Sequence, residues 1–374
     1  MRVVKARSFP RAGLLGNPSD GYFGKTLSFA FADYCVDLTL SESTKMRFVP
    51  GEVDDATFDS PENLVRDIRL YGYYGGIRML KAVAKLFFEY CFEHGLTLPK
   101  VNFAAEYKIN IPRLVGLSGS SAICSAMLKA LCRFYEVEIP LEYQPTICLE
   151  AEKFELGINC GFQDRVIQIY NGLVFMDFEK SFVESHNYGR YERLDPSPLF
   201  PLSSSLLALS SSLPHLPSSL NLYIAFDPNR AEESGQAHKK VKRLFEEKQP
   251  DILAAMTEFA DIAQQGRDLL VAAQSVRSNW HSQFAALVNA NFDLRDKIFN
   301  VAEQNRRMVM TARKSGASAK FAGSGGAIVG TYEDEAQFAR LQRDLAEIGC
   351  TTFKPILALS DDTHSPQSGT WRNS

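Results

Sequence analysis

The spacing of apolar side chains predicts a mixture of strands and helices in the first part of the chain. Short apolar runs bounded by polar or turn-forming residues occur at the N-terminus, over 27–40 and over 101–111, as is typical of strands. Over 61–94 the spacing becomes helical in two pieces, and over 123–134 apolar residues again repeat every three or four positions. We therefore expect strands to be interleaved with helices that each bury one face.

The same two periods continue through the rest of the chain. Residues 145–156 have helical spacing, and Asn171-Gly172 is a turn signal between two apolar runs. Further on, the pattern predicts helices over 236–247, 251–275, 280–314 and 335–348, strands over 222–226 and 351–358, and a strand, a glycine loop and a second strand over 319–331. Because strands and helices do not alternate regularly, we expect an α+β fold with mixed sheets rather than a dinucleotide-binding sheet.

A change in composition divides the chain. Residues 195–220 are rich in Ser, Pro and Leu, which is typical of a linker or an insertion. A chain of 374 residues has room for about two domains of ~100–200 residues each. We expect an N-terminal domain over 1–190, a linker or insertion over 191–218, a C-terminal domain over 219–360 and a polar tail over 361–374.

Composition and charge restrict the class of protein. Apolar residues make up 45% and charged residues 23% of the chain, and the formal net charge is −3. These values argue against a disordered chain and against a basic nucleic-acid-binding or membrane-surface protein. The seven cysteines are irregularly spaced without a C-x-x-C motif, which indicates reduced thiols in a cytoplasmic protein. The six histidines lack zinc-binding spacing, and no apolar stretch predicts a membrane span.

One loop has the composition of an anion-binding site. Gly116-Leu-Ser-Gly-Ser-Ser-Ala122 leads into a helical segment, so its small residues leave backbone N–H groups at a helix N-terminus, where phosphates bind. The hydroxyl groups of Ser120 and Ser121 can contact phosphate or Mg²⁺. An ordinary helix-capping loop is the alternative, because Ser is a favoured N-cap residue. The loop matches neither the Walker A nor the dinucleotide fingerprint.

Two other features suit phosphate chemistry. Gly323, Gly325 and Gly326 lie between two apolar runs, where they permit either close approach of the backbone to another group or a tight turn. Glu152 and Asp164 are carboxylates of the kind that phosphoryl transfer uses, one for Mg²⁺ and one beside the attacking hydroxyl. A surface acid or a helix cap is the alternative for each.

Three separate segments resemble the motifs of the GHMP small-molecule kinases, and together they span about 11–330. These segments are Arg11-Ala-Gly-Leu-Leu-Gly-Asn-Pro-Ser-Asp-Gly-Tyr-Phe-Gly-Lys25, Pro112-x-x-x-Gly116-Leu-Ser-Gly-Ser-Ser-Ala122 and Gly323-Ser-Gly-Gly326. The first is similar to that of the plant-type glucuronokinases, with Asn17-Pro18 where galactokinases carry Glu-His. Tyr71–Ile77 and Ser234–His238 also resemble that group. The resemblance implies a two-domain α+β fold, with a ribosomal-S5-like N-terminal domain and a ferredoxin-like C-terminal domain.

The resemblance also implies roles for individual residues. Asp164 would face the reacting hydroxyl, as general base or electrostatic anchor, with Arg11 beside it and the γ-phosphate. Ser121 and Glu152 would hold Mg²⁺. ATP would be bound by Gly116, Leu117, Ser118, Gly119, Ser120, Ser121 and Ala122. The sugar would be bound by Asp20, Asn17, Arg113, Gly323, Gly325 and Gly326, and Tyr71–Ile77 would border the nucleotide base.

The implied reaction is the ATP-dependent phosphorylation of the anomeric hydroxyl of D-glucuronate, which would supply UDP-glucuronate synthesis. The partners would be small molecules, without nucleic acid or membrane. Kinases of arabinose, galactose or a heptose phosphate, and a sugar sensor without catalysis, are the alternatives. A glucuronate substrate carries a carboxylate that a cation must meet. Arg113, Lys25, Arg165 and Arg230 are candidates that the sequence does not separate.

Overall fold

The structure is a computed structural model that describes residues 1–51, 54, 60, 61, 65, 75–200, 220–228, 235–273 and 280–359. Several sequence-based expectations fall wholly or mostly outside these residues, namely Tyr71–Ile77, Arg230, the linker from 201 onward and the polar tail, and of Ser234–His238 only the backbone from 235 onward is described. In the described part, no helix is both long and apolar enough to cross a bilayer.

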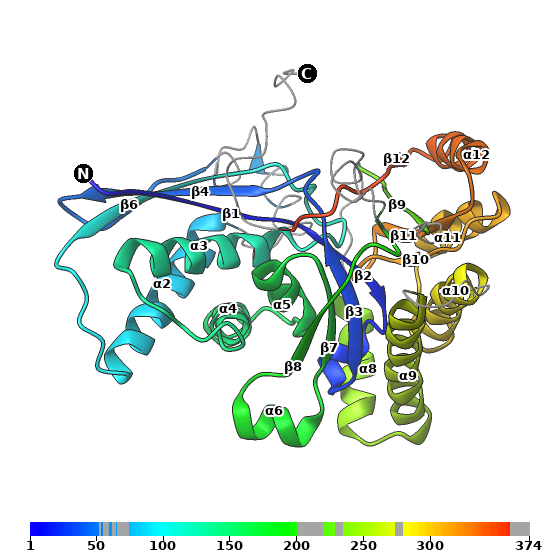
Figure 1. Ribbon diagram of the computed structural model, residues 1–374, viewed down its shortest axis with the longest axis horizontal. Coiled ribbons are helices and arrows are strands. Elements are labelled where there is room, and N and C mark those ends of the chain that lie inside the picture. Colours follow the sequence, from blue (N-terminus) through cyan, green and yellow to red (C-terminus); the bar gives the residue numbers. More distant parts are fainter. Residues whose placement is uncertain are drawn as a thin grey trace, which may run out of the picture.

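The first sheet has a helical layer on one side (Figure 1). Its strands lie in the order β1 (Val3–Ser8), β4 (Val36–Ser43), β6 (Asn102–Ile109) and β5 (Arg47–Phe48). Helix α3 (Gly119–Tyr135) packs against β1 and β4, and α2 (Gly76–Glu93) packs against α3. Helix α3 is buried along most of its length because its sequence is apolar or small almost throughout.

The second sheet lies in the middle of the molecule and has helices on both sides (Figure 1). Its strands lie in the order β2 (Arg11–Leu15), β3 (Lys25–Ala30), β7 (Leu173–Asp177) and β8 (Arg190–Leu194), and all are antiparallel. Helix α5 (Gln163–Tyr170) covers one side and α9 (Pro250–Ala273) the other. The remaining short elements are η1 (Ser19–Tyr22), α4 (Gln144–Glu150), the π-helix η3 (Ala151–Glu155) and α6 (Lys180–His186).

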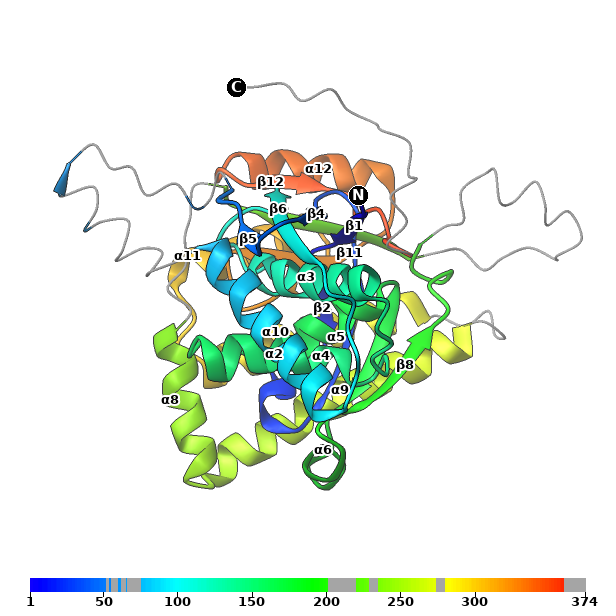
Figure 2. The same cartoon turned by 90° about the vertical axis from the view of Figure 1, so that its left-hand side faces the viewer.

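The third sheet follows the expected ferredoxin-like arrangement. Its strands lie in the order β10 (Lys320–Phe321), β11 (Ala327–Tyr332), β9 (Asn221–Phe226) and β12 (Thr351–Phe353), all antiparallel. The chain order is β9, helices, β10, β11, α12 (Glu335–Ala346) and β12. The first connection holds α8 (Gly235–Glu246), α9, α10 (Trp280–Ile298) and α11 (Glu303–Lys314). Figure 2 shows α12 above β12 at the top of the molecule.

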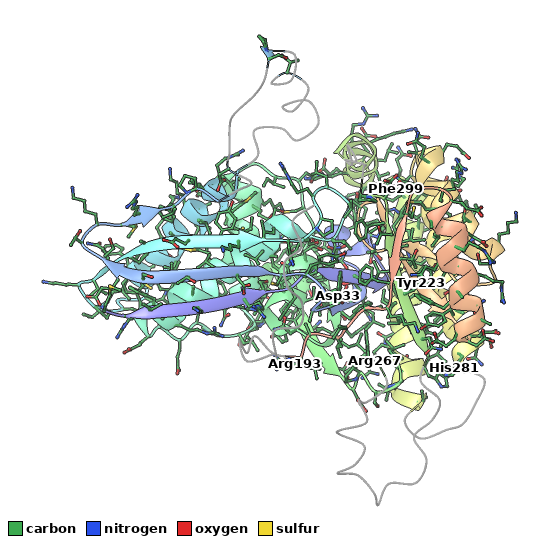
Figure 3. The ribbon with its side chains drawn as sticks, turned by 90° about the horizontal axis from the view of Figure 1, so that it is seen from above. Asp33, Arg193, Tyr223, Arg267, His281 and Phe299 are labelled. Carbon is green, nitrogen blue, oxygen red and sulfur yellow. The ribbon has the colours of Figure 1, made fainter. Side chains whose placement is uncertain are left out.

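The segment that follows β12 packs back on the N-terminal part of the chain. After β12 the backbone returns to β3, where Phe31 bridges Leu357 and Asp33 accepts a hydrogen bond from the Ile356 N–H at 2.8 Å. Figure 3 shows Asp33 at this junction. One apolar core runs through both parts. The first two sheets precede residue 200 and the third follows residue 220, which is the division we propose for the domains over 1–190 and 219–360.

The structure refines four details of the sequence-based elements. The segment over 11–25, whose Gly, Pro, Asn and Asp residues are typical of a loop, begins as strand β2, so Arg11 projects from a sheet. The helix expected over 280–314 is two helices, α10 and α11. Asn171-Gly172 lies between the two apolar runs as expected, and the run before it is helix α5 while the run after it is strand β7. The strand expected over 351–358 ends at Phe353.

Candidate active site

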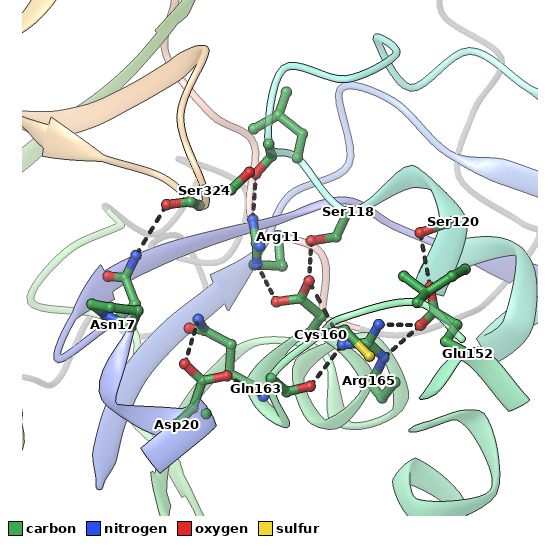
Figure 4. Close-up of a pocket in the computed structure, with 18 of the residues that line it drawn as sticks. Arg11, Asn17, Asp20, Ser118, Ser120, Glu152, Cys160, Gln163, Arg165 and Ser324 are labelled. Carbon is green, nitrogen blue, oxygen red and sulfur yellow. Dashed lines mark hydrogen bonds and ion pairs between the residues drawn. The ribbon is translucent and has the colours of Figure 1, made fainter. Parts of the chain in front are cut away.

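A cavity of about 340 Å³ is lined by both parts of the chain. Strand β2, η1, the loop before α3, the π-helix, α5, α8, α10 and the β10–β11 loop all contribute side chains or backbone to it. Figure 4 shows its polar centre. Of the residues singled out from the sequence, those that line it are Arg11, Asn17, Asp20, Arg113, Gly116, Leu117, Ser118, Gly119, Ser120, Glu152, Asp164, Arg165 and Gly323.

An ion pair between Arg11 and Asp164 lies at the centre of the cavity. Arg11 Nε donates to Asp164 Oδ1 at 2.7 Å, and Ser118 Oγ donates to Asp164 Oδ2 at 2.7 Å. Burial alone would raise the pKa of Asp164, but the charges of Arg11 and Arg165 and the hydrogen bonds from Arg11 and Ser118 lower it below its usual range. Asp164 is therefore a fixed, ionised carboxylate with about 20% of its side chain exposed.

The glycine–serine loop meets Asp164 through a special backbone conformation. Ser118 is the N-cap of α3 and has a left-handed φ of 66°, which a non-glycine residue rarely adopts. In this conformation its hydroxyl reaches Asp164, while its carbonyl accepts from Gln168 Nε2 at 2.8 Å. Helix α3 begins at the next residue, Gly119, so the first-turn N–H groups and the positive end of the helix dipole lie beside the cavity. N–H groups in this position are the kind of donor that anion sites use.

Glu152 is held by two different groups. Its Oε1 accepts from Ser120 Oγ at 2.8 Å, and its Oε2 accepts from Arg165 Nε at 2.6 Å and from Arg165 Nη2. Both Glu152 and Arg165 are buried. Glu152 lies on the π-helix, an irregular turn that often occurs at functional sites. In Figure 4 this group lies on the opposite side of Arg11 from Asn17 and Asp20.

Ser121, which the resemblance pairs with Glu152, makes its hydrogen bond to the backbone of the glycine–serine loop. Its side chain is fully buried, and its hydroxyl donates to the Ser118 carbonyl at 3.2 Å. It is not among the residues that line the cavity, whereas Ser120 is. The reason is helical geometry, since successive residues of a helix differ in direction by ~100°.

Asp20 is buried on the other side of the ion pair. It accepts from the backbone N–H and from Nε2 of Gln163, both at 3.2 Å. Burial and the nearby charge of Asp164 raise the pKa of Asp20 to about 6. Gln163 is oriented in turn by Ser28, whose hydroxyl donates to Gln163 Oε1 at 2.9 Å. Neither Gln163 nor Ser28 stands out in the sequence, although Gln163 directly precedes Asp164.

The C-terminal glycine loop packs tightly on the first part of the chain. A Cβ at Gly323 would lie 2.2 Å from the Gly116 carbonyl oxygen and 2.8 Å from Arg11 Nη1. Gly116 has a φ of +78°, and its own Cβ would lie 2.4 Å from the Gly325 carbonyl oxygen. Gly326 approaches Val115 in the same way, with a φ of +75°. These glycines therefore permit two backbones to touch, as the close-approach alternative required.

Lys320 forms hydrogen bonds beside the same contact. It is fully buried, and its Nζ donates to the carbonyls of Gly13 at 2.5 Å and Phe321 at 2.8 Å and to Asn17 Oδ1. The three oxygen atoms match the three N–H donors of an ammonium group. Asn17 Nδ2 in turn donates to the Gly323 carbonyl at 3.5 Å. Asn17 is thus a buried link between the two parts of the chain.

The cations expected to meet a substrate carboxylate are in very different positions. Lys25 does not line the cavity and donates to Gln264 Oε1 at 2.9 Å, with Asp177 3.6 Å away. Arg165 is bound to Glu152. Arg113 lines the cavity and is exposed. Two lining cations were not singled out from the sequence, Arg295 on α10 and Lys242 on α8. Arg295 had a detectable signal, because it falls on the buried stripe of its helix.

Comparison with known proteins shows the family of the chain. A model of the GHMP kinases N terminal domain matches residues 78–172. The chain is 42% identical to a probable glucuronokinase 2 of Arabidopsis thaliana over 87% of this chain and 84% of that protein. It is 38% identical to glucuronokinase 1 of the same plant over 95% of this chain and 92% of that protein.

A solved structure shows the same fold. The galactokinase of Lactococcus lactis, determined with galactose, superimposes with a TM-score of 0.71 over 95% of this chain and 94% of its own, at 13% identity. The expected α+β fold with two domains is therefore confirmed. The family model matches the segment around the glycine–serine loop, and the sequence identity extends over most of the chain. The chain therefore belongs to the GHMP kinase family and is a phosphotransferase.

Proposed function

We propose that this kinase transfers the γ-phosphoryl group of ATP to the anomeric hydroxyl of D-glucuronate and forms D-glucuronate 1-phosphate for UDP-glucuronate synthesis. The observation that carries the proposal is the 38–42% identity to two glucuronokinases over most of the chain. The Arg11–Asp164 pair in a cavity bordered by an anion site supports it. Asn17 also argues against galactose, because galactokinases carry a charged pair there.

The nucleotide is assigned to the side of the cavity formed by the glycine–serine loop. Gly116, Leu117, Ser118, Gly119 and Ser120 line the cavity, while Ser121 and Ala122 are fully buried and support the helix behind it. Backbone N–H groups at the start of α3 suit phosphate oxygens. Arg113, at the edge of the same loop, is exposed and in reach of an anionic ligand.

Glu152 and Ser120 fit the donor chemistry of Mg²⁺, which prefers oxygen ligands and often takes only one or two from the protein. Within the described ranges no cluster of three or more His, Cys, Asp or Glu side chains could hold a metal alone, so substrate phosphates would complete the coordination. We therefore assign the metal to Glu152 and Ser120 in place of Ser121. Bound Mg²⁺ would neutralise charge on the phosphate oxygens.

Transfer requires one bond to form and one to break. The anomeric oxygen bonds to the γ-phosphorus, the bond from that phosphorus to the bridging oxygen of ADP breaks, and the hydroxyl proton passes to solvent water. Arg11 opposes the charge on the transferred group, and Asp164 orients the hydroxyl. The lowered pKa of Asp164 makes it a weak base and favours the role of electrostatic anchor, with proton transfer late in the step.

The sugar is assigned to the side of the cavity with Asp20 and Asn17. Asp20 accepts hydrogen bonds from Gln163 and borders the cavity, so it can receive sugar hydroxyls. The glycine loop over 323–326 would close this side of the site by its contact with Gly116. We also propose that the enzyme acts in the cytoplasm on small molecules alone, in keeping with its composition.

A coupled assay of ADP release tests the substrate. D-Glucuronate, D-galactose, L-arabinose and a heptose phosphate are compared at equal concentrations, and we expect glucuronate to give the highest kcat/KM. Activity on galactose or arabinose that equals or exceeds that on glucuronate would remove the substrate assignment while leaving a kinase. Binding of sugar without ADP release from any of the four would indicate the sensor.

A further inference from the structure

We propose that Arg295 is the residue that binds the substrate carboxylate and thereby selects a sugar acid over a neutral sugar. This inference rests on the proposed function. It assigns to a residue of the C-terminal part a specificity that the three motifs do not contain. Arg295 lies on α10, at the end of the stripe formed by Phe284, Val288 and Phe292, and its side chain is 3% exposed.

The chemistry of the sugar limits where this cation can lie. In a pyranose the carboxyl carbon is attached to C5, and C5 and C1 are both bonded to the ring oxygen. The carboxylate and the reacting hydroxyl therefore lie on the same edge of the ring. A cation that meets the carboxylate must lie within one sugar of Asp164.

Arg295 satisfies this condition through Gly323. Arg295 Nη1 donates to the Gly323 carbonyl at 2.9 Å, and a Cβ at Gly323 would lie 2.8 Å from Arg11 Nη1. Arg11 in turn bonds Asp164. One glycine therefore separates the Arg295 guanidinium from the ion pair at the reaction centre. Asn17, assigned to the sugar, contacts the same Gly323 carbonyl.

The Arg295 side chain is also held rigidly. Its Nη2 donates to the Ser324 carbonyl at 2.7 Å, and its guanidinium lies 5.3 Å from the ring centroid of Phe299 and 5.1 Å from that of Phe321. These contacts fix the plane of a group that has five N–H donors and matches a carboxylate with two of them. A preorganised cation binds an anion without the entropic cost of ordering a side chain.

The other cations of the cavity suit this role less well. Arg11 and Arg165 are each bound to a carboxylate, Asp164 and Glu152. Lys153 lies over the rings of Phe154 and Phe162, beside Glu152 in the chain. Arg113 and Lys242 line the cavity but are exposed, and water and salt weaken their attraction for a carboxylate.

The test compares a charged substrate with its neutral isostere. kcat/KM is measured for D-glucuronate and for D-glucuronamide, with the wild type, Arg295→Gln, Arg295→Lys and Arg113→Gln. We expect the wild type to prefer the acid by about 10- to 100-fold, the range of one charge-assisted hydrogen bond. Arg295→Gln should bring this ratio close to 1, Arg295→Lys should give an intermediate ratio, and Arg113→Gln should keep the wild-type ratio.

The ratio of the two kcat/KM values separates specificity from structural damage, because damage lowers kcat/KM for both substrates alike. A wild-type ratio in Arg295→Gln, or a ratio near 1 in Arg113→Gln, would overturn the inference, as would a rise in the KM for ATP with an unchanged ratio. If Arg295→Gln does not fold, Arg295→Lys tests the inference instead. An unchanged ratio in Arg295→Lys contradicts binding of the carboxylate by two N–H groups of the Arg295 guanidinium. If the wild type does not phosphorylate glucuronate at all, the proposed function itself fails.

Discussion

Arg11 Nε and Asp164 Oδ1 lie 2.7 Å apart at the point where strand β2 faces helix α5. The pair brings together two residues that are 153 positions apart in the chain. Ser118 binds the second oxygen of Asp164, so the carboxylate is fixed on both sides. The arrangement leaves an ionised group of fixed orientation beside the anion site, as a kinase needs to position an acceptor hydroxyl.

Removing the charge of Asp164 should therefore slow turnover strongly and spare nucleotide binding. For Asp164→Asn we expect kcat to fall by about 10²–10⁴-fold, because the hydroxyl loses its charged partner. The dissociation constant of ATP, measured by calorimetry, should change by less than about threefold. Asp37→Asn, which disrupts a surface ion pair with Arg7, is the control and should have near-normal kcat. A normal kcat in Asp164→Asn would contradict the assigned role.

The two adjacent serines should respond differently to substitution. Ser120→Ala removes the hydroxyl that contacts Glu152 and should raise the Mg²⁺ concentration for half-maximal activity by about tenfold. Ser121→Ala removes a buried hydrogen bond to a backbone carbonyl. It should lower the free energy of unfolding by about 1 kcal/mol without altering the Mg²⁺ requirement. Titration of activity with Mg²⁺ checks both, and the opposite pattern would restore Ser121 as the metal ligand.

Asp20 should reduce stability at neutral pH. The pKa of Asp20 is raised to about 6 in the folded protein, above its value of about 3.9 in an unfolded chain. The folded state therefore binds the proton more tightly, and the stability that Asp20 contributes below pH 4 is lost as the pH rises through 6. Asp20→Asn should raise the Tm by a few degrees at pH 7.5, with the difference vanishing near pH 4.

Thermal unfolding of the wild type and Asp20→Asn across this pH range is the measurement. The KM for the sugar should rise in the same variant, because Asp20 is assigned to the sugar hydroxyls. An equal or lower Tm of the variant at pH 7.5 would show that ionised Asp20 is not costly to the fold.

The glycine loop should not tolerate a methyl group. Gly323→Ala places a Cβ 2.2 Å from the Gly116 oxygen, so the two loops must separate and Arg11 must move. We expect kcat/KM to fall by at least about 10²-fold, since a displacement of ~1 Å in an active site has this effect. Gly21→Ala is the control, because a Cβ at Gly21 meets no atom within 4 Å. Similar activities of the two variants would show that the loop contact does not position the site.

The sequence predicted those parts of the fold and site that local composition encodes. The glycine–serine loop before α3 and the glycine loop between β10 and β11 were found because their backbone conformations require small residues. Arg11 was matched to Asp164 only through the family resemblance, since nothing in the spacing of residues joins β2 to α5. The break between α10 and α11 could not be predicted within 280–314, because both helices are amphipathic and their apolar spacing looks continuous.

The rest of the site depends on tertiary contacts. Whether Ser120 or Ser121 faces Glu152 depends on how α3 is rotated, which packing against β1 and β4 decides. Arg295 and Lys320 are basic residues, and only the folded chain shows that Arg295 donates to carbonyl oxygens of the β10–β11 loop and Lys320 to the Gly13 carbonyl of β2. These residues belong to the site because the fold buries them there, and the spacing of residues in the sequence does not predict this burial.

The position of the transferred phosphate is the most direct test of the account. D-Glucuronate labelled with ¹³C at C1 is incubated with ATP, Mg²⁺ and the wild type, and the product is examined by ³¹P NMR. We expect a phosphate signal split by coupling to the labelled carbon, and far less of this product after the same time with Asp164→Asn. A phosphate attached to another oxygen of the sugar, or an equal amount of product with Asp164→Asn, would contradict the claim that Asp164 lies beside the anomeric hydroxyl.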